Sequence, residues 1–236
     1  MTDPMTHDAI KQTLIQAGRV LAAAGQDDFT RGHISMRLPD NSGLFFMKAH
    51  STGLDEITMD NILTIGLDGD VVAGNAQRHS EVFIHSEIFK TRGDVNCVLH
   101  THPAHAVALS GSGRPLACLS QPAALFHHAL GMYDQSINLI RTPEMGAAVA
   151  RALGPHRAVL LKNHGVVTAA ATVAEAVISA IMLENAAQIQ MIAQAAGETA
   201  PEFPADDIEK LKRNLSQPEQ FAINFDYLVR RLTQNS

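Results

Sequence analysis

The stretch Val95-Asn-Cys-Val-Leu-His-Thr-His-Pro103 indicates both the fold and the chemistry of this chain. Its apolar first half predicts a buried strand, and Pro103 predicts the start of a new helix, because proline is tolerated in the first turn of a helix. Side chains two positions apart leave a strand on the same face, so His100 and His102 project together. Two adjacent imidazoles supply two of the three nitrogen ligands typical of a catalytic divalent metal site. The alternative is a pair of hydrogen-bonded histidines at a strand end.

Strands and helices are predicted on both sides of this stretch, from hydrophobic periodicity and capping signals. The predicted helices are 8–25, 80–90, 142–153 and 172–196, and the predicted strands are 31–38, 44–48, a hairpin over 63–72, 158–162 and 166–171. Several neighbouring strands are joined by short turns, so we expect a mixed or antiparallel sheet with helices on its faces, built as one α/β domain.

Composition excludes several classes of protein. The chain has 236 residues, of which 46% are hydrophobic and 18% charged, so it can bury a core and disorder is not expected. Its net charge of -6 argues against a nucleic-acid partner. No run of 18 apolar residues predicts a membrane span, and Met1–Pro4 lacks the basic-then-apolar order of a signal peptide. Cys97 and Cys118 do not form a disulfide framework. We expect a soluble, cytoplasmic protein.

Two more residues are candidates for the same site. His164 ends an apolar strand and precedes Gly165, where a sharp turn can expose an imidazole. Glu81 opens a predicted helix beside His79 and Ser80 and is the best-placed carboxylate for proton transfer. Each also has a plainer interpretation: a turn histidine is usually solvated, and an acidic residue in a first helical turn is favoured by the helix dipole.

Five segments, taken in order, resemble the class II aldolase/adducin family from about Ala9 to Ala196. The ordered match is more specific than any single motif. The segments are Gly32-His33-Ile34-Ser35-Met36-Arg37 (the family's Gly-Asn-x-Ser-x-Arg), Ser51-Thr52-Gly53 (its Thr-Gly loop), His79-Ser80-Glu81 (its Ser-Ser-Glu segment), His100-Thr101-His102 with the following Pro-Ala-His, and Asn163-His164-Gly165.

The resemblance implies a three-layer fold, with a central mixed, largely antiparallel sheet flanked by helices. It implies one divalent metal ion per chain held by His100, His102 and His164, and Glu81 as the acid/base that also binds the metal when substrate is absent. Zinc, manganese and magnesium all remain open, because three imidazoles suit zinc while a carboxylate and waters admit the other two.

The resemblance also implies a homo-oligomer, expected to be a tetramer with active sites at its subunit interfaces. We therefore divide the chain into a catalytic domain, residues 1–200, and a C-terminal tail, residues 201–236, that packs at an interface. The aromatic residues Phe225 and Tyr227 of this tail are expected near a neighbour's active site, with Tyr227 binding substrate.

Departures from the sugar-phosphate aldolases bear on the substrate. His33 and His79 stand where those aldolases have Asn and Ser, which help to hold phosphate, and Arg78 is adjacent. A phosphate cradle needs small groups and backbone amides that allow close approach. We therefore predict a flatter, carboxylated or phenolic ligand, bound by His33, His79 and Ser80 together with the Thr52-Gly53 loop. The alternative is that both imidazoles replace Asn and Ser as donors to a phosphate.

The predicted function is that of a metal-dependent carbon–carbon lyase that stabilises a carbanion as an enolate, with decarboxylation of a hydroxylated aromatic or heteroaromatic carboxylate favoured. Retro-aldol cleavage of a small hydroxy acid or sugar phosphate is the close alternative, since the two reactions differ only in what leaves. A non-catalytic interaction module like adducin is the alternative of a different class. Retention of Glu81 and the three histidines argues against it.

Overall fold

An eight-stranded sheet forms the centre of the molecule, with strand order β4-β3-β2-β1-β5-β8-β7-β6. The computed structural model describes residues 6–197 and 202–234, so Met1–Pro4 and the boundary predicted at residue 201 lie outside the described residues. Neighbouring strands pair antiparallel except β6 and β7, which are parallel. The strands are β1 His33–Arg37, β2 Leu44–Lys48, β3 Ile62–Gly66, β4 Val71–Ala73, β5 Cys97–Thr101, β6 Leu130–Tyr133, β7 Ala158–Leu161 and β8 Gly165–Ala170.

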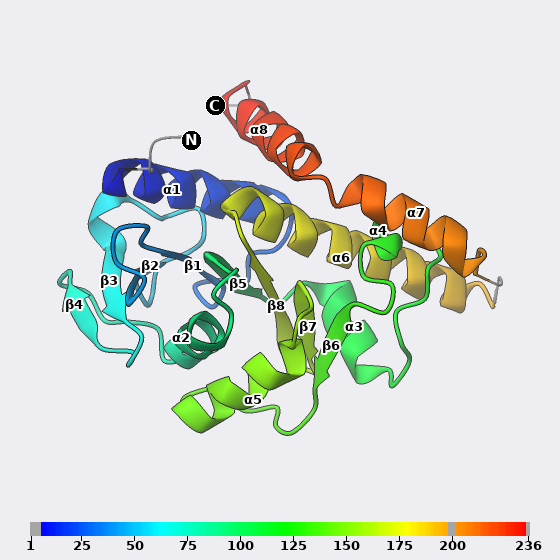
Figure 1. The fold of residues 1–236 in the computed structure, drawn as a ribbon, viewed down its shortest axis with the longest axis horizontal. Coiled ribbons are helices and arrows are strands. Elements are labelled where there is room, and N and C mark those ends of the chain that lie inside the picture. The colour runs from blue at the N-terminus through cyan, green and yellow to red at the C-terminus, as the bar shows by residue number, and fades with distance from the viewer. Residues whose placement is uncertain (1–5, 198–201, 235–236) are drawn as a thin grey trace.

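Helices cover both faces of this sheet (Figure 1). On one face α1 (His7–Ala23) and α6 (Val173–Ala195) pack on each other and on β1, β5 and β8. On the other face α2 (Val82–Thr91) and α5 (Pro143–Leu153) pack together below the strands. Two separate clusters of buried apolar side chains fill the two interlayer spaces. The predicted three-layer architecture with a mixed sheet is confirmed.

Helix α6 is apolar on most of its circumference because other elements surround it. Its first turn is capped as predicted, since Oγ1 of Thr172 accepts a hydrogen bond from the Glu175 amide at 3.1 Å. Its length and composition would allow a membrane crossing. In the structure it is a core helix, packed between β8, α1, α8 and α3 (Ala104–Gly111).

The C-terminal tail folds back along the chain instead of projecting from it. It forms α7 (Ala205–Leu215) and α8 (Pro218–Gln234), which contact the short helix α4 (Gln121–Ala124) and helices α1 and α6. The side chains of Ile208, Phe221 and Phe225 are buried in the apolar cluster to which α1 and α6 also contribute. Phe225 therefore packs in the chain's own core, whereas Tyr227 is half exposed, and the predicted position of the tail at a subunit interface stays a prediction.

Candidate metal centre and active site

His100 lies in the middle of the sheet, with one ring nitrogen free to bind a metal ion. Its ring is fully buried on β5, opposite β8. Nδ1 lies 2.9 Å from the carbonyl oxygen of Val166, so it donates its proton there. This contact leaves a lone pair on Nε2, which is buried and has no hydrogen-bond partner. An imidazole fixed in this way from behind is arranged as metal-ligating histidines are.

His102 and His164 approach the same point from two different segments. His102 follows the last residue of β5, with its ring edge-on to that of His100 at 4.6 Å between centroids. His164 lies in the turn between β7 and β8, directly after Asn163, whose φ is 58°. The rings of His102 and His164 are stacked, with centroids 5.4 Å apart. The sharp turn predicted at His164 is therefore present.

Gly165 permits this close approach of the ligand segments. A Cβ atom at this position would lie 2.6 Å from the carbonyl oxygen of Thr101, 2.8 Å from Cδ2 of His102 and 2.9 Å from Cε1 of His100. Real Cβ atoms do not tolerate such contacts. The absence of a side chain at Gly165 thus lets β8 begin against the histidines.

Glu81 completes the group at the N-cap of α2. Its Oε1 accepts a hydrogen bond from the Ile140 amide at 2.8 Å and lies 3.6 Å from Nε2 of His164, while Oε2 lies 3.8 Å from Nε2 of His100. Burial raises the pKa of this carboxyl, although the Ile140 amide and the charge of Arg141 oppose the shift. The carboxyl can therefore hold a proton closer to neutral pH than an exposed glutamate can.

These four side chains fit a divalent cation. One potential ligand atom from each of Glu81, His100, His102 and His164 lies within 4.8 Å of the others. Burial lowers the pKa of the His100 imidazole well below its usual range and that of His102 to about 4, so both rings are neutral with lone pairs available. Both ring nitrogens of His164 are buried without a hydrogen-bond partner. Unpartnered buried nitrogens converging on one carboxylate are costly unless a cation occupies the space between them.

A buried chain of polar side chains supports Glu81 from the sheet. His33 and His85 are fully buried, and Nδ1 of His33 lies 2.6 Å from Nε2 of His85. Nδ1 of His85 in turn lies 2.6 Å from Oγ of Ser35. The remaining nitrogen of His33, Nε2, faces Oε2 of Glu81 at 3.7 Å. His33 therefore contacts the carboxylate from behind, and its predicted contact with substrate stays a prediction.

A cavity of about 470 Å³ opens onto three of the four candidate ligands, Glu81, His102 and His164, while His100 is fully buried. Its polar wall includes His79 and Ser80, two of the residues predicted to bind substrate, and burial lowers the pKa of His79 to about 3. Its lining residues are Asp28, Arg31, His50, His79, Ser80, Glu81, His102, Ala104, Val107, Ile137, Leu139, Asn163 and His164.

Thr52 and Gly53 do not line this cavity. Both are buried, and the amide of Gly53 donates to Oε2 of Glu56 at 2.7 Å. Nζ of the buried Lys48 donates to the carbonyl of Thr52 and holds the loop from the other side. Arg78 is likewise turned away, with its guanidinium over the ring of Phe83 at 5.5 Å. The structure places the guanidinium of Arg31 at the cavity instead.

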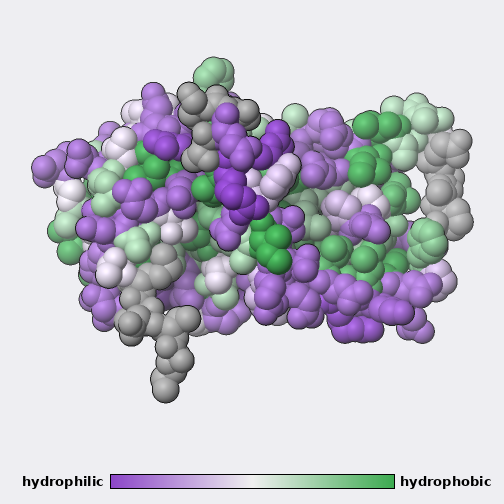
Figure 2. Space-filling view, turned by 90° about the horizontal axis from the view of Figure 1, so that it is seen from above, coloured by the Kyte–Doolittle hydropathy of each residue, from purple (hydrophilic) through white to green (hydrophobic). Residues whose placement is uncertain are grey.

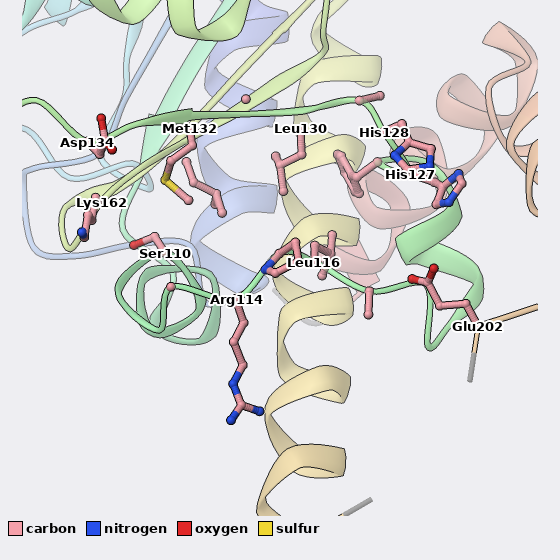
Figure 3. Close-up of a pocket in the computed structure, with 17 residues that line it drawn as sticks. Ser110, Arg114, Leu116, His127, His128, Leu130, Met132, Asp134, Lys162 and Glu202 are labelled. Carbon is pink, nitrogen blue, oxygen red and sulfur yellow. The ribbon is translucent and has the colours of Figure 1, made fainter. Parts of the chain in front are cut away.

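A second and larger cavity of about 780 Å³ lies beside β6 (Figure 3). Asp134 and Lys162 stand at one end of it, and His127, His128 and Glu202 at the other (Figure 3). It contains none of the four candidate ligands. The convergent nitrogens and the carboxyl of raised pKa make the smaller cavity the candidate active site.

Comparison with known proteins agrees with this geometry. The family model described as Class II Aldolase and Adducin N-terminal domain matches residues 12–191. The chain belongs to the class II aldolase/adducin family.

Relatives in this family have different activities in their names. The chain is 32% identical over 219 residues to a 3,4-dihydroxyphthalate decarboxylase from Arthrobacter keyseri, and the match covers 88% of each chain. It is 30% identical over 182 residues to the meiotically up-regulated gene 14 protein of Schizosaccharomyces pombe, covering 76% and 71% of the two chains. Among solved structures, the L-fuculose 1-phosphate aldolase of Glaciozyma antarctica PI12 matches with a TM-score of 0.86 at 25% identity, covering 99% and 94%.

Sequence reasoning did not assign four residues of this site in the class II aldolase/adducin fold. Asp28 and Arg31 lie in the loop before β1, although the sequence predicted a strand from Arg31 onward, and only the tertiary fold brings them beside His102. Ser35 and His85 form the chain behind Glu81. A signal for His85 was available, because it follows Glu81 by one helical turn and lies on the same face of α2.

Proposed function

We propose that this protein is a metal-dependent carbon–carbon lyase that decarboxylates a hydroxylated aromatic or heteroaromatic carboxylate. The observation that carries the choice of substrate is the state of the Thr52-Gly53 loop. A phosphate site needs free backbone amides, but the Gly53 amide already donates to Glu56. A phosphate would have to displace the Glu56 carboxylate from the Gly53 amide and would then be repelled by the negative charge of that carboxylate nearby.

The imidazoles support the same choice. The His79 ring occupies the position of a small residue in the sugar-phosphate aldolases, and it packs at 4.4 Å between centroids against the buried His33 ring. With its pKa lowered to about 3, His79 is neutral at physiological pH and suits a phenolic hydroxyl better than a phosphate dianion. The similarity to a 3,4-dihydroxyphthalate decarboxylase agrees with such a ligand.

Glu81 would handle the proton in this reaction. A divalent cation held by His100, His102 and His164 would supply a Lewis acid that polarises a substrate oxygen. The bond between the ring carbon and the carboxylate breaks, carbon dioxide leaves, and the electron pair remains on the ring carbon. Glu81 then delivers a proton to that carbon from Oε2, because Oε1 is engaged by the Ile140 amide. The raised pKa of Glu81 favours the protonated form that this step needs.

The test compares two substrate classes under one metal condition. Purified protein supplied with zinc, manganese or magnesium is assayed for carbon dioxide release from 3,4-dihydroxyphthalate and for aldehyde release from L-fuculose 1-phosphate, with Glu81→Gln as the blank. Release of carbon dioxide without cleavage of the sugar phosphate supports the proposal. Cleavage of the sugar phosphate with no decarboxylation overturns it.

Retro-aldol cleavage is the second candidate. It is favoured by the structural likeness to an L-fuculose 1-phosphate aldolase, which extends over 99% of this chain. The same metal centre and Glu81 would serve it, with an aldehyde leaving in place of carbon dioxide. A non-catalytic module would not need four convergent ligand groups, and the metal content of the purified protein separates that class from both enzymes.

Association into a homo-oligomer, a tetramer in our proposal, is supported by the surface. Ile137 and Leu139 line the cavity but are 63% and 38% exposed. Figure 2 shows further hydrophobic residues on the surface near the C-terminal end of α6. Ile189 and Ile192 are exposed in this part of the helix. A subunit contact would bury such residues and could bring a neighbour's Tyr227 to the cavity. Light scattering that shows an active monomer contradicts this part of the proposal.

A further inference from the structure

Arg31 supplies the permanent positive charge of the cavity. It is the one lysine or arginine among the described residues that line it. Its side chain is 62% exposed, and Nη2 lies 2.7 Å from Oδ1 and 2.6 Å from Oδ2 of Asp28. An exposed ion pair of this kind contributes little to folding stability. Folding stability therefore does not account for Arg31, and its position in the cavity points to a role in ligand binding.

Asp28 couples this guanidinium to the metal centre. Its Oδ2, which contacts Arg31, also lies 3.2 Å from Nδ1 of His102. This contact is an ion-pair distance and not a hydrogen bond, because Nδ1 of His102 has no hydrogen-bond partner among the described residues. The contact of Asp28 with both residues thus places Arg31 beside the candidate ligand His102.

The guanidinium retains donors for a ligand. An arginine has five N–H donors in one plane and can bind a carboxylate through two of them. Within the part of the chain that the structure describes, the hydrogen bonds of Arg31 go to Asp28 through Nη2. Nε and Nη1 are available. Val107, Ile137 and Leu139 also line the cavity, and their apolar side chains suit the face of a ring.

We propose that Arg31 binds a carboxylate that the substrate keeps throughout the reaction, and that Asp28 is the positioning residue that aims the guanidinium. The substrate is then an aromatic or heteroaromatic dicarboxylate, which loses one carboxylate and is held by the other. This inference rests on the proposed decarboxylase function. The cavity volume of about 470 Å³ lies in the range of small-molecule sites.

Charge movement during the reaction decides which carboxylate Arg31 holds. A departing carboxylate loses its negative charge as carbon dioxide forms. A cation paired with it would stabilise the ground state more than the transition state and would slow the reaction. A cation paired with the retained carboxylate holds the ring equally well in both states. The retained group is therefore the ligand of Arg31.

The experiment measures binding of two unreactive probes to the zinc-loaded protein by calorimetry. Phthalate carries two carboxylates and benzoate carries one. Wild type should bind phthalate more tightly than benzoate. Arg31→Gln should weaken phthalate binding about 10- to 100-fold, as expected for loss of a charge-assisted hydrogen-bonded pair, with benzoate affinity and zinc content unchanged. Arg31→Lys should restore part of the loss, because it keeps the charge but not the planar fork.

Asp28→Asn and Arg151→Gln complete the design. Asp28→Asn should weaken phthalate binding in the same direction as Arg31→Gln. Arg151→Gln is the matched control, because Arg151 is exposed on α5 and does not line the cavity, and both affinities should stay at the wild-type values. The inference is overturned if Arg31→Gln changes neither affinity, weakens both probes equally, or loses zinc.

The two proposals fail in different ways. Selective binding of phthalate through Arg31 in a protein that releases no carbon dioxide from any hydroxylated aromatic acid would overturn the function and leave the carboxylate receptor standing. Decarboxylation of mono- and dicarboxylates at equal rates, unaffected by Arg31→Gln, would overturn the receptor and leave the function standing.

Discussion

Nδ1 of His33 and Nε2 of His85 are 2.6 Å apart, and both rings are completely buried. The pair connects β1 to α2 behind the carboxyl of Glu81, and Ser35 closes the chain on the other side of His85. Burial lowers the pKa of His85 to about 3 and that of His33 well below its usual range. The folded protein therefore keeps both rings neutral where the unfolded chain would protonate them.

This difference predicts how stability depends on pH. An unfolded histidine has a pKa of about 6.5, so between about 6.5 and the folded value of about 3 the unfolded state binds one more proton at His85. Stability must fall as the pH falls through that window, by about 1.4 kcal/mol per pH unit for each such histidine. His85→Gln should make the slope shallower by about that amount, measured by urea unfolding between pH 6 and 4. His128→Gln, at an exposed position, measures the loss of an imidazole outside this network. An unchanged slope in His85→Gln would contradict the prediction.

Removing one candidate ligand should remove the metal. His102→Ala takes away an imidazole at the cavity wall without opening the core, because His102 lies beyond the end of β5. Elemental analysis should show the content falling from one ion per chain towards zero, while circular dichroism shows a folded protein. His156→Ala, in the turn before β7, serves as the control. Metal content that stays at the wild-type value in His102→Ala means that the ligand assignment is wrong.

Gly165→Ala should weaken metal binding, although Gly165 is not itself a candidate ligand. Its Cβ would meet the Thr101 carbonyl and the rings of His102 and His100, all within 2.9 Å. The ligand segments must then move apart, and we expect metal affinity to fall about 10- to 100-fold, the range found when groups that orient metal ligands are altered. Competition with a chelator measures the affinity. Gly93→Ala is the matched control, since a Cβ there has no atom within 4 Å.

Neutral replacement of Glu81, the proposed catalytic acid, should separate chemistry from folding. Glu81→Gln keeps the acceptor for the Ile140 amide but cannot transfer a proton. Turnover of the decarboxylation substrate should fall about 100- to 10,000-fold, the usual contribution of general acid–base catalysis. Glu87→Gln, on the same helix but paired with Lys90, should retain most of the activity. Near-normal turnover by Glu81→Gln would assign the proton transfer to another group.

Periodicity and side-chain parity were enough to predict the centre of the fold. His100 and its neighbours lie on β5 as the apolar run indicated, and the helices from Thr142 and Thr172 begin at their predicted caps. Strand β6 was not predicted, because its four residues show no alternation of apolar and polar side chains. It contains Gly131, where a side chain is excluded because a Cβ atom would clash with the carbonyl oxygen of Ala152.

The tail and half of the site depended on tertiary contacts. Pro204 interrupts the helical pattern in the sequence, and in the structure it is the N-cap of α7, after α6 has ended at Ala195; the two tail helices themselves were not predicted. Asp28 and Arg31 acquire their significance only because the loop before β1 folds over the end of β5. No local pattern connects a loop carboxylate with a histidine so far along the chain.

The hydrogen bond between His100 and Val166 joins two segments that lie 66 positions apart in the sequence. An ion held by His100 and His102 from one segment and by His164 from the other would tie these segments a second time. Closing a loop of that size costs chain entropy in the unfolded protein. The metal ion must also compete with protons for the histidine nitrogens. The ion would act as a reversible cross-link. Its binding would complete the proposed reactive centre and, at the same time, hold β5 and β8 together in the middle of the sheet.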